Sequence, residues 1–482
     1  MPVSMQDLLH RSEPALRKER YSELTHTFQF NGEFFAYDSE SGAFHHLDEA
    51  AFLLIQACQA NGSKMPDRPG DYVPKLPAEE VAVLCSEIEQ LIEAGELFAE
   101  GVKISADQLY PDGVVLKAMC LIICQACNLR CRYCFAADGT YGDSEQSMMS
   151  YETGKRAVDF LIEKSAGRKN LDLDFFGGEP LLNWNVVKQL AVYAGQAGLA
   201  AGKNIRLTLT TNATSLDAEK TSFINKYFKN VVLSLDGRRE VNDRMRLDAG
   251  GNGSYDMVAP KIRDFIAERA GQEYYIRGTF TVYNLDFTAD ALHLAEFGSN
   301  ISLEPVISAP GCDYGIGLEN IPAIEMEYEK LALAIDELDR RGKDINYFHF
   351  ALDLSGGPCL YKRLKGCGVG LEYCAVAANG DIYPCHQLVG EREYLLGSVR
   401  NERHNLKRSV RESFYRFLLS DQEPCSSCWA RYHCGGGCAA DVLHVNGDLT
   451  GLNEISCRLM KKRLECALWL AYRKSTRRED KF

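Results

Sequence analysis

The segment Cys127-Asn-Leu-Arg-Cys131-Arg-Tyr-Cys134 decides how this chain is interpreted. It follows an apolar run at residues 114–124, VVLKAMCLIIC, which predicts a buried strand. Three thiolates on a short loop can hold three irons of a 4Fe–4S cluster and leave the fourth iron open to a small molecule. A structural zinc site is the alternative, although such sites usually have four protein ligands. Cys124 keeps this alternative open, because Cys124 and Cys127 also form a CxxC pair.

Strand candidates recur after this loop, and amphipathic helical patterns separate them. Strands that alternate with helices predict βα units and a parallel sheet. The expected fold class is α/β, a partial (β/α)6 barrel with its chemistry at the carboxyl ends of the strands. The five later strands are expected at LDLDFF (171–176), IRLTLTT (205–211), NVVLSLD (230–236), YYIRGTFTV (274–282) and ISLEPV (301–306).

The CxxxCxΦC spacing, with Tyr133 as its aromatic residue, resembles the signature of radical S-adenosylmethionine (SAM) enzymes. Gly177-Gly178-Glu179-Pro180 is similar to the GGEP motif of that family, and residues 242–246 resemble its HDxxR run with Asn242 in place of His. The resemblance implies that Cys127, Cys131 and Cys134 hold a radical-generating 4Fe–4S cluster. It also implies that S-adenosyl-L-methionine binds at Tyr133, Gly177, Gly178, Glu179, Thr211, Asn212, Ser234, Asp236, Arg246 and Arg277.

Cysteine is unusually frequent near the end of the chain. Of 18 cysteines, 15 lie between Cys120 and Cys134 or after residue 350, and clustered cysteines in a reducing compartment are more often metal ligands than disulfides. The later spacing resembles the SPASM pattern of radical SAM enzymes, which implies two auxiliary 4Fe–4S clusters. The outer cluster would be held by Cys425, Cys428, Cys434 and Cys457, and the inner cluster by Cys367, Cys385 and Cys438.

Two questions about these cysteines stay open in the sequence. Cys359 is either the fourth ligand of the inner cluster or leaves that place to substrate, and a zinc ribbon is the alternative for residues 425–438. His386 either tunes a cluster through a hydrogen bond or is an ordinary packed histidine. Core thiols are expected at Cys58, Cys85 and Cys466, and are favoured over ligands at Cys120, Cys124, Cys312 and Cys374.

The first hundred residues predict a small β-then-α unit. Asn31-Gly32 between aromatic runs predicts a hairpin, and Asp48 can cap a following helix. Residues 25–105 resemble a leader-peptide recognition domain, a three-stranded sheet with three helices in a winged arrangement, which would bind a peptide as an added strand. The other expected divisions are an arm at 1–24, a radical SAM core at 113–320, a bridging helix at 321–354 and a SPASM domain at 355–475.

Charge and hydrophobicity limit the classes of partner that the chain is expected to bind. Its net charge of −13 argues against a nucleic-acid surface. The sequence contains no run of roughly 20 apolar residues and no apolar core of a signal peptide near residue 1. A cytoplasmic protein without membrane contact is therefore expected.

Nearly the whole chain, roughly residues 25–472, is similar to thioether-forming maturases of the SCIFF and ranthipeptide type, with quinohemoprotein amine dehydrogenase maturases as close relatives. The resemblance implies an enzyme that installs Cys-sulfur-to-carbon crosslinks in a ribosomally made precursor peptide through a 5′-deoxyadenosyl radical. A flavodoxin- or ferredoxin-type electron donor is implied as a further partner.

Two alternatives stay open. One is another SPASM chemistry, such as formylglycine formation in sulfatases, which needs a catalytic aspartate; Asp286 and Asp313 are the candidates. The other is an iron–sulfur electron carrier, which would not need the GGEP, Ser234 and Arg277 set.

Overall fold

The computed structural model of the chain describes residues 22–101, 106–110, 113–142, 145, 147–307, 311–352, 354, 364–401, 406–417 and 425–479. Cys359 and nearly all of the expected N-terminal arm lie outside the described residues.

A parallel sheet forms the centre of the molecule, and its barrel strands are the six expected from the sequence. They are β4 (Ala118–Cys124), β6 (Asn170–Gly177), β7 (Asn204–Thr211), β8 (Asn230–Ser234), β10 (Glu273–Phe280) and β11 (Asn300–Pro305). Each is parallel to its neighbour in the order β11-β10-β8-β7-β6-β4. The parallel α/β sheet predicted from the alternating pattern is therefore confirmed.

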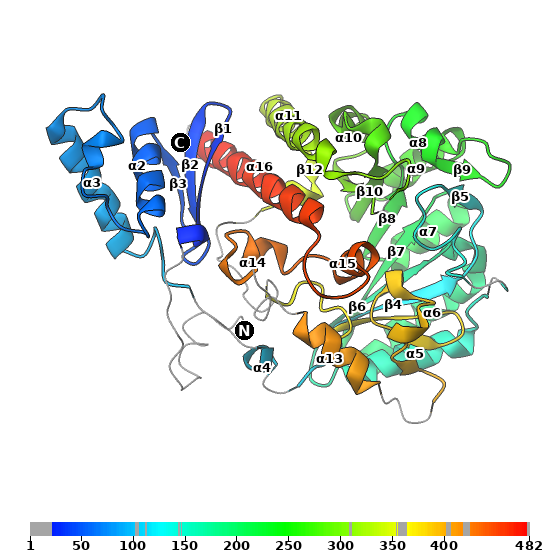
Figure 1. Cartoon of the computed structure of the whole chain (residues 1–482). Helices are drawn as coiled ribbons and strands as arrows, with labels where there is room; N and C mark the ends of the chain where they lie inside the picture. Colours follow the sequence, from blue (N-terminus) through cyan, green and yellow to red (C-terminus); the bar gives the residue numbers. More distant parts are fainter. Residues whose placement is uncertain are drawn as a thin grey trace.

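Helices follow the strands and cover the outer face of the sheet (Figure 1). They are α5 (Tyr151–Lys164), α6 (Trp184–Ala200), α7 (Ala218–Tyr227), α8 (Arg239–Met245), α9 (Tyr255–Glu268), α10 (Phe287–Leu294) and α11 (Ile321–Arg340). The last of these is the helix expected as a bridge. It connects β11 to the parallel strand β12 (Asn346–Tyr347) and packs against both α10 and the C-terminal helix α16 (Glu454–Glu479).

The Cys-rich C-terminal part extends the barrel sheet beyond its first strand. Strand β13 (Tyr373–Val376) pairs in parallel with β4, and β14 (Asp381–Tyr383) and β15 (Gly397–Ser398) continue the sheet in antiparallel fashion. Cys385, which follows β14 and is one of the cysteines expected to hold the inner cluster, is thus tied directly to the barrel sheet. Among the described residues of this part, the helices are α13 (Arg408–Arg416), α14 (Arg431–Cys434), α15 (Ala439–Asn446) and α16.

The N-terminal unit contains the antiparallel sheet β1-β2-β3, formed by β1 (Thr25–Phe30), β2 (Glu33–Asp38) and β3 (Phe44–Leu47). Asn31 and Gly32 have positive φ angles of 49° and 81° in the expected hairpin turn. Asp48 caps α2 (Glu49–Ala60) by accepting a bond from the Ala51 amide at 2.7 Å, as predicted. Helices α3 (Ala78–Glu93) and α4 (Ala106–Leu109) follow.

Helix α16 joins this unit to the barrel (Figure 1). Trp469 stacks on Phe30 of β1 with ring centroids 4.6 Å apart, and its indole nitrogen donates to Glu33 at 2.8 Å. On the barrel side, Lys462 donates to Glu329 of α11 at 2.7 Å. The N-terminal sheet therefore lies between α2 and α16.

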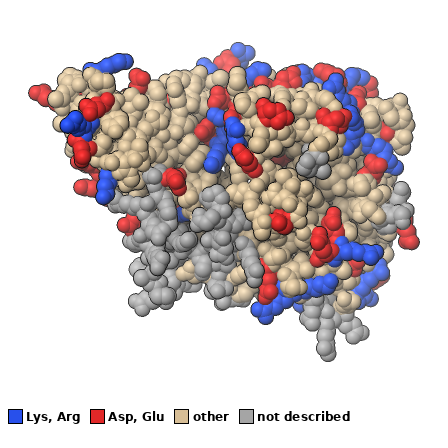
Figure 2. All heavy atoms as spheres, viewed as in Figure 1, with Lys and Arg blue, Asp and Glu red and all other residues tan. Residues whose placement is uncertain are grey.

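The described surface carries both signs of charge. Figure 2 shows Lys and Arg side chains interspersed with Asp and Glu side chains over the visible face. Within the described residues, no helix combines the length and apolar character needed to cross a membrane.

One acidic side chain on the inner face of the sheet is electrostatically unusual. Leu171, Leu173 and Phe175 of β6 are fully buried, whereas Asp172 and Asp174 alternate with them and point to the opposite face. Asp174 pairs in register with Cys120 of β4 and Thr208 of β7. Burial and the neighbouring Asp172 carboxylate raise the pKa of Asp174 to about 7, against the opposing hydrogen bond from Thr208.

Replacing Asp174 with asparagine should change how stability depends on pH. A carboxyl group with a raised folded-state pKa contributes stability at low pH and loses it as the pH rises through that pKa. Relative to the Asp174→Asn variant, the wild-type free energy of unfolding should fall by roughly 1 kcal/mol from about pH 6 to about pH 8. Chemical denaturation of both anaerobically reconstituted proteins measures this. A difference that is the same at both pH values would contradict it.

Candidate functional site

A short β-ladder holds the loop that carries Cys127, Cys131 and Cys134. Its strand β5 (Leu129–Cys131) pairs antiparallel with β9 (Arg246–Asp248), which places Cys131 opposite Arg246. The amide of Arg132 donates to the Met245 carbonyl at 2.9 Å, and that of Cys134 donates to the Cys131 carbonyl at 3.0 Å. The segment after β8 thus fixes the three thiols at the carboxyl edge of the sheet.

The glycines of the GGEP motif lie directly against this loop. The Gly178 amide donates to the Cys124 carbonyl at 2.8 Å, and a Cβ at Gly178 would stand 2.1 Å from the Ala126 carbonyl oxygen. At Gly177, whose φ is 140°, a Cβ would stand 2.3 Å from the Cys124 carbonyl oxygen. Only glycine allows this approach of strand end and loop.

Glu179 links two strand ends through its buried carboxylate. It accepts bonds from the Thr211 hydroxyl at 2.8 Å, the Asn212 amide at 2.7 Å and the Leu181 amide at 3.0 Å. Burial raises the pKa of Glu179 to about 6, and these bonds limit the rise. The Asn212 side chain in turn donates to the Cys127 sulfur at 3.6 Å. The GGEP and Thr211-Asn212 motifs therefore form one network that reaches the cysteine loop.

Tyr133, Asp236 and Arg246 form a second network. The Tyr133 hydroxyl donates to Asp236 at 2.6 Å, and Arg246 Nη1 donates to that hydroxyl at 2.9 Å. Arg246 is 8% exposed, and its Nε has no hydrogen-bond partner among the described residues. A buried donor of this kind fits a site completed by a polar ligand.

Ser234 and Arg277 are register partners on β8 and β10, so both candidates stand at one level of the sheet. Arg277 lies 3.6 Å from Glu304, which also pairs with His349 at 3.0 Å. Burial opposes the charge of Glu304, but His349 and Arg277 together hold its pKa well below the usual range. The structure thus brings all ten expected SAM contacts to the carboxyl half of the barrel strands or to the loops that follow them.

The three cysteines of the loop after β4 are Cys127, Cys131 and Cys134, and their thiols suit a cationic group. Burial raises the pKa of Cys127 to about 12 and that of Cys131 to about 11, the latter against the opposing charge of Arg246. Cys124, in contrast, is fully buried and donates its thiol to the Ala126 carbonyl at 3.2 Å. Three neighbouring thiols at the carboxyl edge of the sheet fit the donor set of an iron–sulfur cluster.

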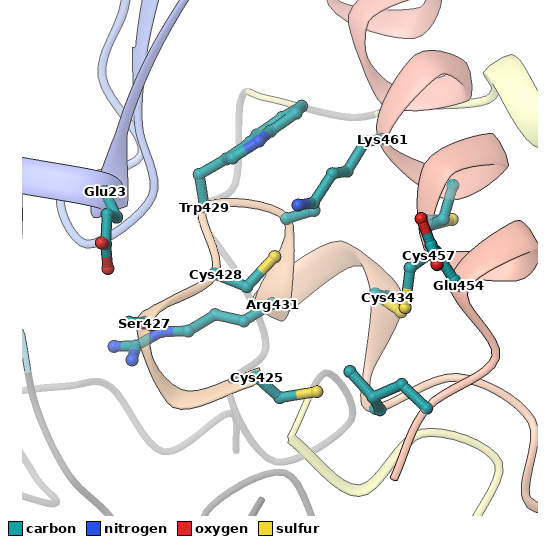
Figure 3. A pocket seen from close by; sticks show the side chains of 14 residues that line it. Glu23, Cys425, Ser427, Cys428, Trp429, Arg431, Cys434, Glu454, Cys457 and Lys461 are labelled. Carbon is teal, nitrogen blue, oxygen red and sulfur yellow. The ribbon is translucent and has the colours of Figure 1, made fainter. Parts of the chain in front are cut away.

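Four C-terminal cysteines line one pocket of about 460 Å³. Cys425, Cys428 and Cys434 come from the segment around α14, and Cys457 comes from α16 together with Lys461 (Figure 3). Burial and the neighbouring thiols raise the pKa of Cys425 to about 12, and Lys461 opposes that shift. These are the four cysteines expected to hold the outer cluster.

The three cysteines expected at the inner cluster also lie near one another. Burial, with Cys438 and Cys367 nearby, raises the pKa of Cys385. Cys438 stands at the N-cap of α15, where backbone amides oppose the rise in its own pKa. His386 Nδ1 lies 3.6 Å from the Cys385 sulfur and 3.0 Å from the Tyr373 hydroxyl, so it is a packed histidine that also lies within reach of one expected ligand.

Within the described part of the chain, no three His, Cys, Asp or Glu side chains meet at a point suited to one metal ion. Cluster ligands bind separate irons and so surround a cage instead of meeting at a point. The remaining described cysteines fall outside these groups. Cys58, Cys120, Cys374 and Cys466 are buried among apolar side chains, and Cys85 and Cys312 are partly exposed.

The comparisons with known proteins agree with this geometry. Residues 121–267 match the family model of the Radical SAM superfamily. An uncharacterized protein of Methanocaldococcus jannaschii is 31% identical over 296 residues, which cover 61% of this chain and 91% of that protein. The chain belongs to the radical SAM superfamily. S-adenosyl-L-methionine and one 4Fe–4S cluster are the cofactors that this membership implies.

Two further proteins resemble this radical SAM chain over much of its length. A cysteine-type anaerobic sulfatase-maturating enzyme of Clostridium novyi is 24% identical over 67% of this chain and 88% of its own. The structure of Streptococcus suis SuiB bound to S-adenosylmethionine has a TM-score of 0.54 at 14% identity, and covers 91% of this chain and 100% of its own. The family and the maturase-type fold expected from the sequence are therefore confirmed.

Sequence reasoning missed the residues that brace the site. These residues are the β5–β9 ladder and Gly139, and neither belongs to a recognisable sequence motif. A Cβ added at Gly139 would stand 2.7 Å from both Cys127 Cβ and Gly178 Cα. The unusual Asn242 is fully buried and donates to Asp243 at 3.0 Å and to Ser254 at 3.2 Å, so it serves as a structural amide at this position.

Gly178→Ala should disrupt the radical site, because the added methyl group would collide with the Ala126 carbonyl. We expect the loss of about four irons per chain and S-adenosylmethionine affinity weaker by about tenfold or more. Gly195→Ala in α6 is the matched control, since its Cβ meets no described atom within 4 Å. Iron analysis and equilibrium binding measure the two effects. Full iron content and unchanged affinity in the Gly178 variant would refute the assigned contact.

Proposed function

We propose that this chain is a radical SAM maturase that forms Cys-sulfur-to-carbon thioether crosslinks in a Cys-containing precursor peptide. The observation that carries the proposal is the arrangement of three parts in one chain. A radical SAM barrel, a pocket lined by Cys425, Cys428, Cys434 and Cys457, and a small sheet with β3 at its edge lie together around α16. A barrel for chemistry beside an edge strand for a leader peptide suits a peptide substrate.

The bound cofactors supply one-electron cleavage of a sulfonium bond and hydrogen abstraction from an unreactive carbon. The residues of the chain hold and orient them. Cys127, Cys131 and Cys134 would hold the radical cluster, while Gly177, Gly178 and Arg246 would receive S-adenosylmethionine. Glu179 braces the strand ends from inside and is fully buried, so its role is to position that edge.

The C-terminal cysteines would hold two auxiliary clusters, which gives three clusters in all. Thioether formation from a thiol and a carbon–hydrogen bond releases one electron beyond the hydrogen atom that is abstracted, so a nearby acceptor is required. The inner set, Cys367, Cys385 and Cys438, joins the barrel through β13 and β14 and is the better placed of the two. A flavodoxin- or ferredoxin-type partner would reduce the radical cluster.

Sulfatase maturation is the second candidate, and the similarity to the Clostridium novyi enzyme favours it. The two aspartates considered for that chemistry are engaged elsewhere. Asp286 pairs with Arg238 at 2.9 Å, and Asp313 pairs with Arg132 at 2.7 Å, each on the surface. The SPASM alternative that matures quinohemoprotein amine dehydrogenase shares the proposed architecture, and identification of the crosslinked product would separate it.

The triple replacement Cys127→Ala, Cys131→Ala and Cys134→Ala should abolish 5′-deoxyadenosine formation under dithionite. Iron should fall from about twelve to about eight per chain, because the auxiliary cysteines lie on separate segments. Cys85→Ala, which removes a partly exposed thiol of the N-terminal unit, is the control. Continued S-adenosylmethionine cleavage by the triple variant would sink the radical assignment. Stoichiometric zinc with only about four irons in the wild type would reject the auxiliary clusters.

His46→Pro should weaken peptide binding without breaking the ladder between β2 and β3. The Asp38 amide bonds to the Ala43 carbonyl, and ladder bonds alternate from there, so the His46 amide faces the open edge. Proline removes that donor, and we expect an affinity loss of about tenfold.

The control for this test is His46→Ala, which removes the stacking of the imidazole on Tyr472 but keeps the amide. Peptide affinity, and crosslinked product detected as the mass loss of one hydrogen pair per bond, are the measurements. Equal affinity in the proline variant and the wild type would contradict leader binding at β3.

A further inference from the structure

The turn between β2 and β3 carries a buried carboxylate that contacts the outer-cluster segment. Glu40 is 7% exposed and forms an ion pair with Arg431, and the Tyr432 hydroxyl donates to it at 3.1 Å. Arg431 and Tyr432 are also buried, and both lie between the ligands Cys428 and Cys434. A side chain of the N-terminal unit therefore holds the backbone on which the outer-cluster cysteines are mounted.

Two further contacts join the same two segments. The His26 ring stacks on Trp429 with centroids 3.8 Å apart and planes 4° from parallel. The Tyr37 hydroxyl lies 2.9 Å from His433 Nε2. The stretch from Trp429 to His433 thus rests on the β1–β2 sheet and on the turn that follows it.

Arg431 also connects the ion pair to the cluster pocket. Its Nη1 donates to the Ser426 carbonyl, between Cys425 and Cys428. Arg431 lines the pocket, and so does Glu23 of the N-terminal unit, which lies toward the same end of the pocket as the Arg431 guanidinium (Figure 3). The guanidinium charge therefore lies against the backbone loop that carries Cys425 and Cys428, and Glu40 neutralises it.

We propose that Glu40 is a positioning residue of the outer-cluster site. The N-terminal unit then contributes to this site in addition to its proposed role in binding a peptide. The inference rests on the proposed outer cluster. Glu40 holds Arg431 and Tyr432, which belong to the segment between Cys428 and Cys434, and balances the positive charge at the backbone of the Cys425–Cys428 loop. The N-terminal unit and the outer cluster form one structural and electrostatic unit.

Single replacements should shift the outer-cluster potential in opposite directions. Glu40→Gln leaves the Arg431 cation unbalanced and favours the more negative reduced cluster, so the midpoint potential should rise. Arg431→Gln leaves the Glu40 anion and should lower it. At the wild-type midpoint, we expect the ratio of reduced to oxidised outer cluster to change about threefold or more, upward in the first variant and downward in the second.

The double variant Glu40→Gln with Arg431→Gln restores the net charge and should return the potential toward the wild-type value. Glu49→Gln is the matched control, because Glu49 is an exposed glutamate in the first turn of α2. The experiment is an anaerobic redox titration of the full-length reconstituted protein followed by electron paramagnetic resonance, with iron analysis. Selective loss of about four irons in the Glu40 variant would also support the positioning role.

Each outcome decides the proposal. Wild-type potential, spectrum and iron content in the Glu40→Gln variant would overturn it and leave the proposed function standing. A wild-type protein without the outer cluster's iron would overturn both. If the Glu40 variant does not fold, the downward shift in Arg431→Gln and its reversal in the double variant still test the inference, and shifts of the same sign in all variants would refute it.

Discussion

The backbone contact between Gly178 and Ala126 is the constraint on which the radical site depends. It brings the end of β6 within hydrogen-bond distance of the cysteine loop, and no residue with a Cβ fits there. Glu179 then ties the end of β6 to the start of the segment after β7. Through Asn212 the same network reaches the Cys127 sulfur, so one close approach orders three polar motifs around three thiols.

Buried carboxylates in the barrel and buried thiols at the cysteine sites are stabilised to different degrees by neighbouring groups. In the barrel, Asp236 is compensated by Tyr133 and Arg246, and Glu304 by Arg277 and the neighbouring His349, so carboxylates are kept in place by guanidinium, imidazole and hydroxyl groups. At Cys131 and Cys425, burial raises the thiol pKa, and the nearby cations Arg246 and Lys461 offset only part of that rise. Such sites are poor places for free thiolates and suitable places for thiolates bound to iron.

Helix α16 contacts the barrel, the C-terminal cysteine pocket and the N-terminal sheet, and so connects these three parts. It packs on α11 of the barrel, supplies Cys457 to the outer-cluster pocket and covers the N-terminal sheet through Trp469 and Tyr472. Removing the N-terminal unit would expose this apolar face and leave Arg431 buried without its carboxylate. The peptide-binding role is therefore better tested by a change at the edge of β3 than by deletion.

Local chemistry explains what the sequence by itself determined. Cluster ligation needs particular residues at short spacings, so ligands could be predicted within residues 127–134 and 425–434 from the order of the cysteines, and the alternation of apolar runs predicted the six parallel strands. Tertiary structure alone decided the rest. The ion pair of Glu40 with Arg431 joins residues 391 positions apart, and the pairing of β13 with β4 joins the Cys-rich part to the first barrel strand. Such contacts depend on packing across elements and on the burial that packing produces, and a buried glutamate has the same local sequence signal as an exposed one.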